Sequence, residues 1–230
     1  MSISSNLERI RNEIADACAR AHRSPSTVAL MAVSKMHPAE AILEALAAGQ
    51  RLFGENRVQE WQSKRPAVSA ADLQIHLIGP LQNNKTTRAA ELFHAVDTLD
   101  SFKTAERLNR AAAALNKTLP VLIEVKLSPE NTKHGLAPEL LPTLLDQLTP
   151  LTNLTLRGLM TVPPWCTPED AETARPYFAH LRRLRDQLQP THPTLTELSM
   201  GMTNDFHIAI EEGSTTVRIG TAIFGKRIHT

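Results

Sequence analysis

A lysine closes a short apolar run early in the chain. Lys35 follows Ala32, Val33 and Ser34 in a stretch whose composition predicts a buried strand. An amine at the end of such a strand is partly desolvated. Desolvation lowers a lysine pKa, which raises the neutral fraction able to attack an aldehyde. Lys35 is therefore a candidate for a Schiff base, although the pattern taken alone favours an ordinary surface lysine at a strand end.

Two turns near the C-terminus have the composition of a phosphate site. Ser199, Met200 and Gly201 end one predicted strand, and Gly220 and Thr221 end the next. Glycine lets backbone N–H groups approach phosphate oxygens closely, and hydroxyl groups add donors. Such turns are also common at strand ends that bind nothing, so their composition alone leaves both interpretations open.

Lys35 and these turns together describe a site for a phosphorylated aldehyde. A short helix expected to begin near Asp205 would direct its N-terminus toward the same region. Two kinds of ligand satisfy this description: pyridoxal 5′-phosphate (PLP) and the sugar phosphates of Schiff-base aldolases.

Arg218 favours the first of these ligands. It stands two residues before Gly220 on the last predicted strand, so the two residues share a face. A guanidinium facing the pyridine nitrogen of PLP would keep that nitrogen unprotonated, because a permanent cation disfavours a second one beside it. The ring would then be a weak electron sink, suited to holding the cofactor or to racemisation rather than to transamination. A structural salt bridge is the alternative role for Arg218.

Three further side chains are weaker candidates for cofactor contacts. Asn56 follows the second strand and is expected beside the ring, while His76 lies in the third strand, either near the barrel mouth or as an interior histidine. Met160 ends the sixth strand and is expected to pack in the barrel and touch the ring. The nine histidines show no HExxH or HxH spacing, so we predict no metal site.

Eight short apolar runs alternate with helical patterns along the chain. This order predicts an α/β fold, a (β/α)₈ or TIM barrel, whose active residues lie at the carboxyl ends of the strands. An open doubly wound sheet is the alternative, but no Gly-x-Gly-x-x-Gly follows the first run. With no visible linker or repeat, we expect one domain over residues 1–230. Strands are expected at residues 28–35, 51–55, 74–79, 95–99, 121–126, 156–162, 197–200 and 216–220.

Composition narrows the classes of partner. The 25 Lys and Arg against 24 Asp and Glu give a net charge of +1, without the positive excess typical of nucleic-acid binders. We find no apolar segment of membrane-spanning length and no signal-peptide pattern at the N-terminus. The two cysteines form no metal or redox motif. These features favour a soluble cytoplasmic protein that binds neither nucleic acid nor membranes.

Several ordered segments are similar to one known family. The strings AVSK, FGEN, HLIGPLQNNK, RGLM, LSMGM and RIGTAIFG occur in that order at residues 32–35, 53–56, 76–85, 157–160, 198–202 and 218–225. They closely resemble the YggS/PROSC family, the pyridoxal phosphate homeostasis proteins. The similarity spans nearly the whole chain, and ordered strings of this length are far more specific than any single motif.

The resemblance implies both a fold and a cofactor. The fold would be a barrel like the N-terminal domain of alanine racemase. Lys133 resembles a family lysine implicated in a secondary PLP interaction or in PLP release. The resemblance implies that Lys35 forms the Schiff base, that Arg218 lies near the pyridine nitrogen, and that the phosphate contacts lie around Ser199, Gly201, Gly220 and Thr221.

The same resemblance implies PLP balance rather than catalysis. Two-base racemisation needs an acid or base on the ring face opposite the lysine, which in alanine racemases is a tyrosine of the partner subunit set beside an extra β domain. The chain has no room for that domain, and its single tyrosine, Tyr177, falls in a helix. We therefore expect a non-catalytic PLP carrier, monomeric or weakly dimeric, with PLP-dependent apo-enzymes as partners. A low-activity racemase and a Schiff-base aldolase remain alternatives.

Overall fold

The strands of this chain close into a barrel. The computed structural model describes residues 2–68, 70–130 and 134–225, so Lys133 lies outside the described residues. All neighbouring strands are parallel, and β1 closes the circle against β8, with Ala29 opposite Thr216. This closure excludes the open sheet and confirms the predicted barrel. The strands are β1 (Ala29–Val33), β2 (Leu52–Glu55), β3 (Gln74–Leu77), β4 (Ala95–Leu99), β5 (Leu119–Glu124), β6 (Leu154–Met160), β7 (Glu197–Ser199) and β8 (Thr216–Ile219).

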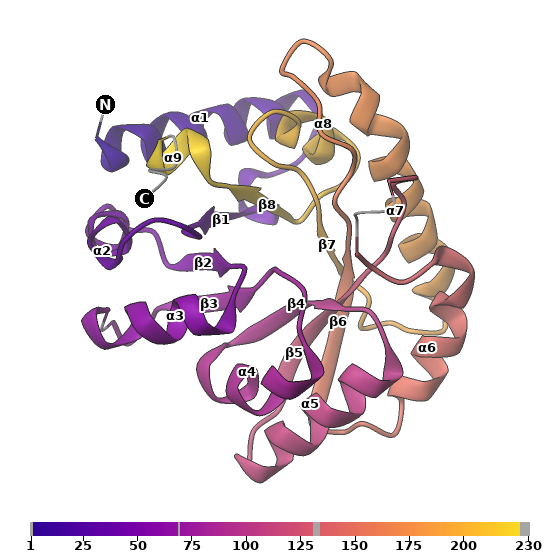
Figure 1. Cartoon of the computed structure of the whole chain (residues 1–230). Helices are drawn as coiled ribbons and strands as arrows, with labels where there is room; N and C mark the ends of the chain where they lie inside the picture. Colours follow the sequence, from indigo (N-terminus) through magenta and orange to yellow (C-terminus); the bar gives the residue numbers. More distant parts are fainter. Residues whose placement is uncertain (1, 69, 131–133, 226–230) are drawn as a thin grey trace.

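Helices ring the outside of the barrel (Figure 1). Helices α1 and α9 lie side by side, and the Asn6 Nδ2 group donates a hydrogen bond to the Ile223 carbonyl oxygen at 2.9 Å. Among the described helices, none combines the length and apolar character needed to cross a bilayer. The helices are α1 (Ile3–Arg20), α2 (Ala39–Ala47), α3 (Val58–Lys64), α4 (Thr86–Leu92), α5 (Phe102–Ala114), α6 (Leu141–Leu148), α7 (Arg175–Leu188), α8 (Phe206–Glu211) and α9 (Thr221–Phe224).

The main core lies between the strands and this outer layer. Alternate strand residues point outward, so Ile75 and Leu77 of β3 are fully buried against helices while His76 between them faces the barrel interior. Trp61 of α3 is 2% exposed, and its indole N–H donates to the Leu92 carbonyl oxygen at 3.0 Å. That bond removes the polar cost of burying the largest side chain in the core.

Two short helices stand at the carboxyl ends of the last strands. Helix α8 begins after Asp205, as expected, and Asp205 Oδ1 accepts a hydrogen bond from the Met202 N–H at 2.6 Å. Helix α9 follows β8 directly and was not predicted. Its four residues are too few for an amphipathic pattern to appear in the sequence.

Candidate cofactor site

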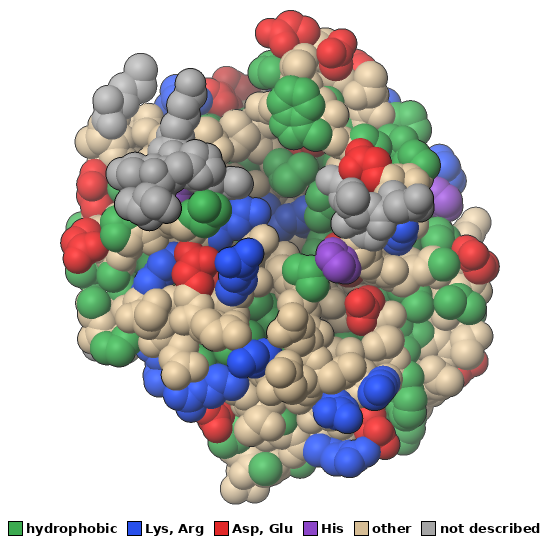
Figure 2. All heavy atoms as spheres, in the orientation of Figure 1, with side chains coloured by type: hydrophobic (Ala, Val, Ile, Leu, Met, Phe, Trp, Pro, Cys, Tyr) green, Lys and Arg blue, Asp and Glu red, His purple; other side chains and the backbone are tan. Residues whose placement is uncertain are grey.

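A cavity of about 550 Å³ opens at the carboxyl ends of the strands. It is lined by residues that end or follow seven of the eight strands, the place where barrel enzymes hold their ligands. Figure 2 shows a hollow near the middle of this face, with Lys and Arg side chains on one side of it and at its bottom. We call this space the Lys35 cavity.

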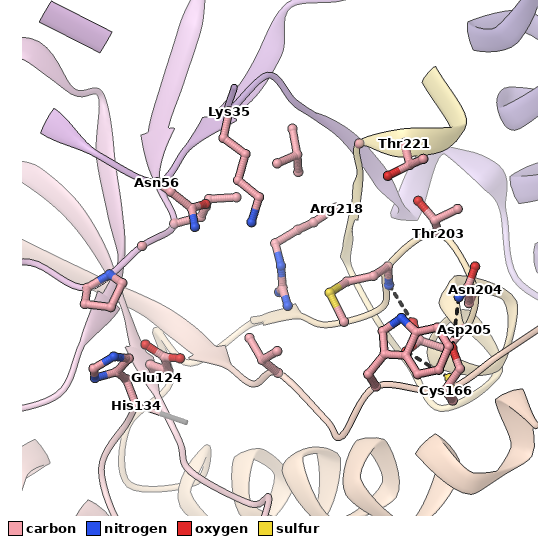
Figure 3. A pocket seen from close by; sticks show the side chains of 18 of the residues that line it. Lys35, Asn56, Glu124, His134, Cys166, Thr203, Asn204, Asp205, Arg218 and Thr221 are labelled. Carbon is pink, nitrogen blue, oxygen red and sulfur yellow. Dashed lines mark hydrogen bonds between the residues drawn. The ribbon is translucent and has the colours of Figure 1, made fainter. Parts of the chain in front are cut away.

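Lys35 projects into this cavity. Its side chain extends from the end of β1 toward the space between Asn56 and Arg218 (Figure 3). Lys35 occupies a tight turn, closed by a 3.1 Å hydrogen bond from the His37 N–H to the Ser34 carbonyl oxygen. The hydrogen bond fixes the backbone of this turn at the barrel mouth, and the Lys35 side chain extends from it so that the amine lies in the cavity.

Arg218 forms the floor of the cavity. It is 5% exposed and spans the ends of three strands. Its Nη1 donates to the Ser199 carbonyl oxygen at 2.6 Å and to Ser199 Oγ at 2.8 Å, and its Nη2 donates to the Thr161 carbonyl oxygen at 2.8 Å. Burial lowers the guanidinium pKa, and the nearby carboxylates of Asp97 and Glu124 oppose that shift. These hydrogen bonds end on neutral oxygens, so they fix the cation without forming the salt bridge considered from the sequence.

The two predicted phosphate turns behave differently. Gly220 and Thr221 line the cavity, whereas the turn after β7 contributes its later residues, Met202, Thr203 and Asn204. Thr203 and Thr221 lie near each other on the same side of the cavity, opposite Asn56 and Glu124 (Figure 3). Backbone and hydroxyl donors therefore gather on one side of the cavity.

Three residues predicted around the β7 turn serve the fold instead of the cavity wall. Ser199 is fully buried and holds Arg218, and Met200 is fully buried in the hydrophobic core. Gly201 has φ +96°, and a Cβ there would lie 2.6 Å from the Cβ of Ala209 in α8. The glycine is needed for that close approach between turn and helix.

His76 and Met160 also lie away from the cavity wall. His76 Nδ1 lies 3.1 Å from Asp97 Oδ1 inside the barrel. Burial lowers the His76 pKa, but the Asp97 carboxylate outweighs it, and the pKa lies above its usual value. Met160 is 1% exposed and packs within the barrel. The predicted residues that line the cavity are Lys35, Asn56, Arg218, Gly220 and Thr221, and those that do not are His76, Met160, Ser199, Met200 and Gly201.

Sequence reasoning missed several polar residues of the cavity. Glu124 ends β5, is 7% exposed and lines the cavity beside His134 (Figure 3). A single carboxylate inside an apolar strand was a usable signal for it, because buried charge is rarely kept without a role. Cys166 and Asp205 come from loops, which carry no such periodic signal. Burial and the neighbouring Asp205 raise the pKa of the Cys166 thiol, so this cysteine is a poor nucleophile.

Neighbouring acidic, histidine and cysteine side chains form no metal-binding cluster within residues 2–68, 70–130 and 134–225. The polar groups of the described cavity are therefore an amine, a fixed guanidinium, the carboxylates of Glu124 and Asp205, two imidazoles, amides, a thiol and hydroxyl groups. Such a set can form an imine and hold an anion.

Three known proteins place this chain among its relatives. The pyridoxal phosphate homeostasis protein of Vibrio cholerae is 46% identical over 233 residues, which cover 98% of this chain and 97% of that protein. The solved structure of PipY from Synechococcus elongatus with PLP bound is 41% identical, with a TM-score of 0.86, and the match covers 97% of this chain and all of PipY. A Clostridium difficile alanine racemase shares only the fold, at 15% identity and a TM-score of 0.67, over 86% of this chain and 52% of that one.

The family model described as alanine racemase, N-terminal domain, matches residues 5–227. Nearly the whole described barrel lies within that match, and relatives at 42–46% identity over nearly the full length share the name pyridoxal phosphate homeostasis protein. The chain therefore belongs to the alanine racemase N-terminal domain family and, within it, to the pyridoxal phosphate homeostasis proteins.

Proposed function

We propose that this protein binds PLP as a Schiff base on Lys35 and serves PLP homeostasis without catalytic turnover. The observation that carries the proposal is the Lys35 amine inside a cavity whose floor is the fixed guanidinium of Arg218. The relatives' shared name and the PLP-bound PipY structure support it. PLP supplies an aldehyde, which a neutral lysine amine converts to an imine with loss of water.

The residues present fit this cofactor. The side-chain oxygen Oδ1 of Asn56 is buried without a hydrogen-bond partner, so a ligand donor in the cavity would remove a desolvation penalty. On the other side, Gly220, Thr203 and Thr221 offer backbone and hydroxyl groups suited to phosphate oxygens. We propose Asn56 as a ring contact and this second group as the phosphate contacts.

We propose that Arg218 faces the pyridine nitrogen and keeps it unprotonated. Its three hydrogen bonds prevent the guanidinium from moving aside, and its cation opposes a second positive charge nearby. A ring without that positive charge withdraws electrons weakly, which suits storage of the cofactor.

One observation keeps a low-activity racemase as the second candidate. Glu124 and His134 line the cavity together, and either group is able to move a proton. Tyr177 lies in α7 and not on the cavity wall. Deuterium exchange at Cα of a panel of amino acids tests this candidate: exchange at rates typical of enzymes contradicts the carrier proposal, and its absence supports it.

We further propose a cytoplasmic protein, monomeric or weakly dimeric, that delivers PLP to apo-enzymes. The net charge of only +1 supports the proposal that the protein does not bind nucleic acid. Transfer of PLP from the loaded protein to an apo-enzyme, compared with free PLP at the same concentration, tests delivery. Transfer no faster than from free PLP contradicts a carrier role.

The central prediction concerns Lys35 itself. Borohydride reduction of the loaded protein is expected to fix the cofactor on a peptide that contains Lys35, as read by mass spectrometry. Lys35→Ala is expected to lose the label and to weaken PLP binding, because the covalent bond is gone. If Lys35→Ala binds PLP as tightly as the unchanged protein, the Schiff-base proposal fails.

A further inference from the structure

A buried cluster of charged side chains lies behind the turn that carries Lys35. Glu55 ends β2, and Glu60 and Lys64 stand one helical turn apart on α3. Lys64 Nζ lies 2.9 Å from Glu55 Oε1 and 2.6 Å from Glu60 Oε1, and the exposed fractions of the three side chains are 10%, 0% and 20%. Burial raises the pKa of Glu55, and the Lys64 ammonium opposes that shift. We call these three residues the Lys64 cluster.

The Lys64 cluster contacts Ser34 and Met36, the residues on either side of Lys35. The Ser34 hydroxyl donates to Glu55 Oε1 at 2.7 Å, and Lys64 Nζ donates to the Ser34 carbonyl oxygen at 2.9 Å. On the other side, the Met36 N–H donates to Glu60 Oε1 at 2.5 Å. The residues described as lining the Lys35 cavity do not include the cluster, so these contacts act on the turn and not on a ligand.

The turn needs such support because one of its residues is strained. Lys35 and Met36 are its two central residues, and Met36 has φ +61°. That left-handed conformation is costly for a residue with a Cβ and persists only where the surroundings enforce it. The hydrogen bond to Glu60 holds the Met36 amide in this orientation, and Lys64 in turn holds Glu60.

We propose that Glu60 and Lys64 are positioning residues for Lys35. They hold the strained turn in the one conformation that directs the amine into the cavity, so that PLP meets a preorganised lysine. This inference rests on the proposed function, in which Lys35 binds PLP. Without the cluster the turn would populate other conformations, and a turn formed in about a tenth of the molecules would raise the apparent Kd for PLP about tenfold.

The first test removes the acceptor for the Met36 amide. Glu60→Ala is expected to weaken PLP binding about tenfold, measured by absorbance titration, and to speed hydrogen exchange at the Met36 amide in the PLP-free protein. The control is Glu106→Ala, which breaks an exposed ion pair of the same spacing, to Arg110 in α5, and is expected to change neither quantity. A folded Glu60→Ala with a Kd within about twofold of the unchanged protein overturns the inference.

The second test separates positioning from ordinary stabilisation. Met36→Gly removes the penalty for the left-handed conformation, and the Met36 side chain is 48% exposed, so little packing is lost. In the Glu60→Ala background this change is expected to restore most of the PLP affinity. If the double variant binds PLP as weakly as Glu60→Ala, strain at the turn is not the cause and the inference fails. Should Glu60→Ala not fold, Glu60→Leu, which also removes the acceptor but keeps a larger side chain with good helix propensity, replaces it in both comparisons.

Failure of the proposed function is distinguishable from failure of this inference. If the unchanged protein binds no PLP, the proposed function fails, but exchange at the Met36 amide still reports whether the cluster holds the turn. If PLP binds through Lys35 and exchange at Met36 is unchanged in Glu60→Ala, only the positioning inference is overturned.

Discussion

At the scale of single residues, Arg218 has two roles: it lines the candidate cofactor site, and its hydrogen bonds stabilise the barrel. Arg218→Leu is expected to lower the free energy of unfolding by about 2–4 kcal/mol, because it removes two hydrogen bonds to Ser199 and the donor that the buried Thr161 carbonyl oxygen accepts from. Urea denaturation of the PLP-free protein measures this loss. The control is Arg157→Leu, whose side chain is about half exposed and whose pair with Glu197 is worth about 0–1 kcal/mol. Equal losses in the two variants would contradict the structural role of Arg218.

The sequence identified residues of the cavity wall where chemistry and strand position agreed. Lys35 and Arg218 were found because each is a charged residue near the carboxyl end of an apolar strand, and both line the cavity. Met200 and Gly201 were also predicted to contact the cofactor, and that contact stays a prediction. In the structure Met200 lies in the core and Gly201 lies against α8, which turn composition alone does not reveal. The Lys64 cluster could not be predicted, since its contacts depend on how α3 packs against β2 and the turn after β1.

At the scale of elements, the close approach of α8 to the turn after β7 positions one side of the cavity. Gly201→Ala is expected to destabilise the fold by about 1–3 kcal/mol more than Gly213→Ala. Both glycines have φ +96°, so the backbone penalty cancels in this comparison. A Cβ at Gly201 meets Ala209 at 2.6 Å, whereas one at Gly213 meets only the flexible end of Arg182 at 3.4 Å.

Denaturation of the two variants measures that difference, and PLP titration adds a second readout. Gly201→Ala is expected to weaken PLP binding as well. Thr203 and Asn204 of this turn line the cavity, and a shift of the turn would move them from their positions there. Gly213 follows α8 at its far end and is expected to leave binding unchanged. Equal stability losses, or equal effects on binding, would show that α8 does not set the position of this turn.

The elements themselves were predicted from apolar periodicity. Each of the eight expected strands exists. Strand β4 has the predicted bounds, β5 and β6 lie two residues nearer the N-terminus than predicted, and the other strands differ by one or two residues at their ends. Helix α9 escaped prediction, since four residues are too short for any period to show.

At the scale of the whole molecule, closure of the barrel buries a polar pair in its interior. His76 of β3 and Asp97 of β4 lie 3.1 Å apart, and β3 and β4 are neighbours in the closed sheet. The sequence predicted the barrel but left His76 open between the mouth and the interior. The location of His76 depends on closure of the barrel, because the interior forms only when β8 pairs with β1, which is far away in sequence.

This pair makes a prediction about global stability and pH. The His76 pKa is raised in the fold, so the pair's stabilising effect is fully present below the unfolded value of about 6.5 and is lost as pH rises through the folded pKa. Burial lowers the pKa of the neighbouring His94. The contribution of His94 therefore has the opposite sign: it lowers the stability of the fold as pH falls below about 6.5. His76→Gln is expected to cost most stability at low pH, with the difference from the unchanged protein shrinking as pH rises above about 6.5. Denaturation across this range measures it, with the exposed His22→Asn as control, and a constant difference would exclude His76 as the source.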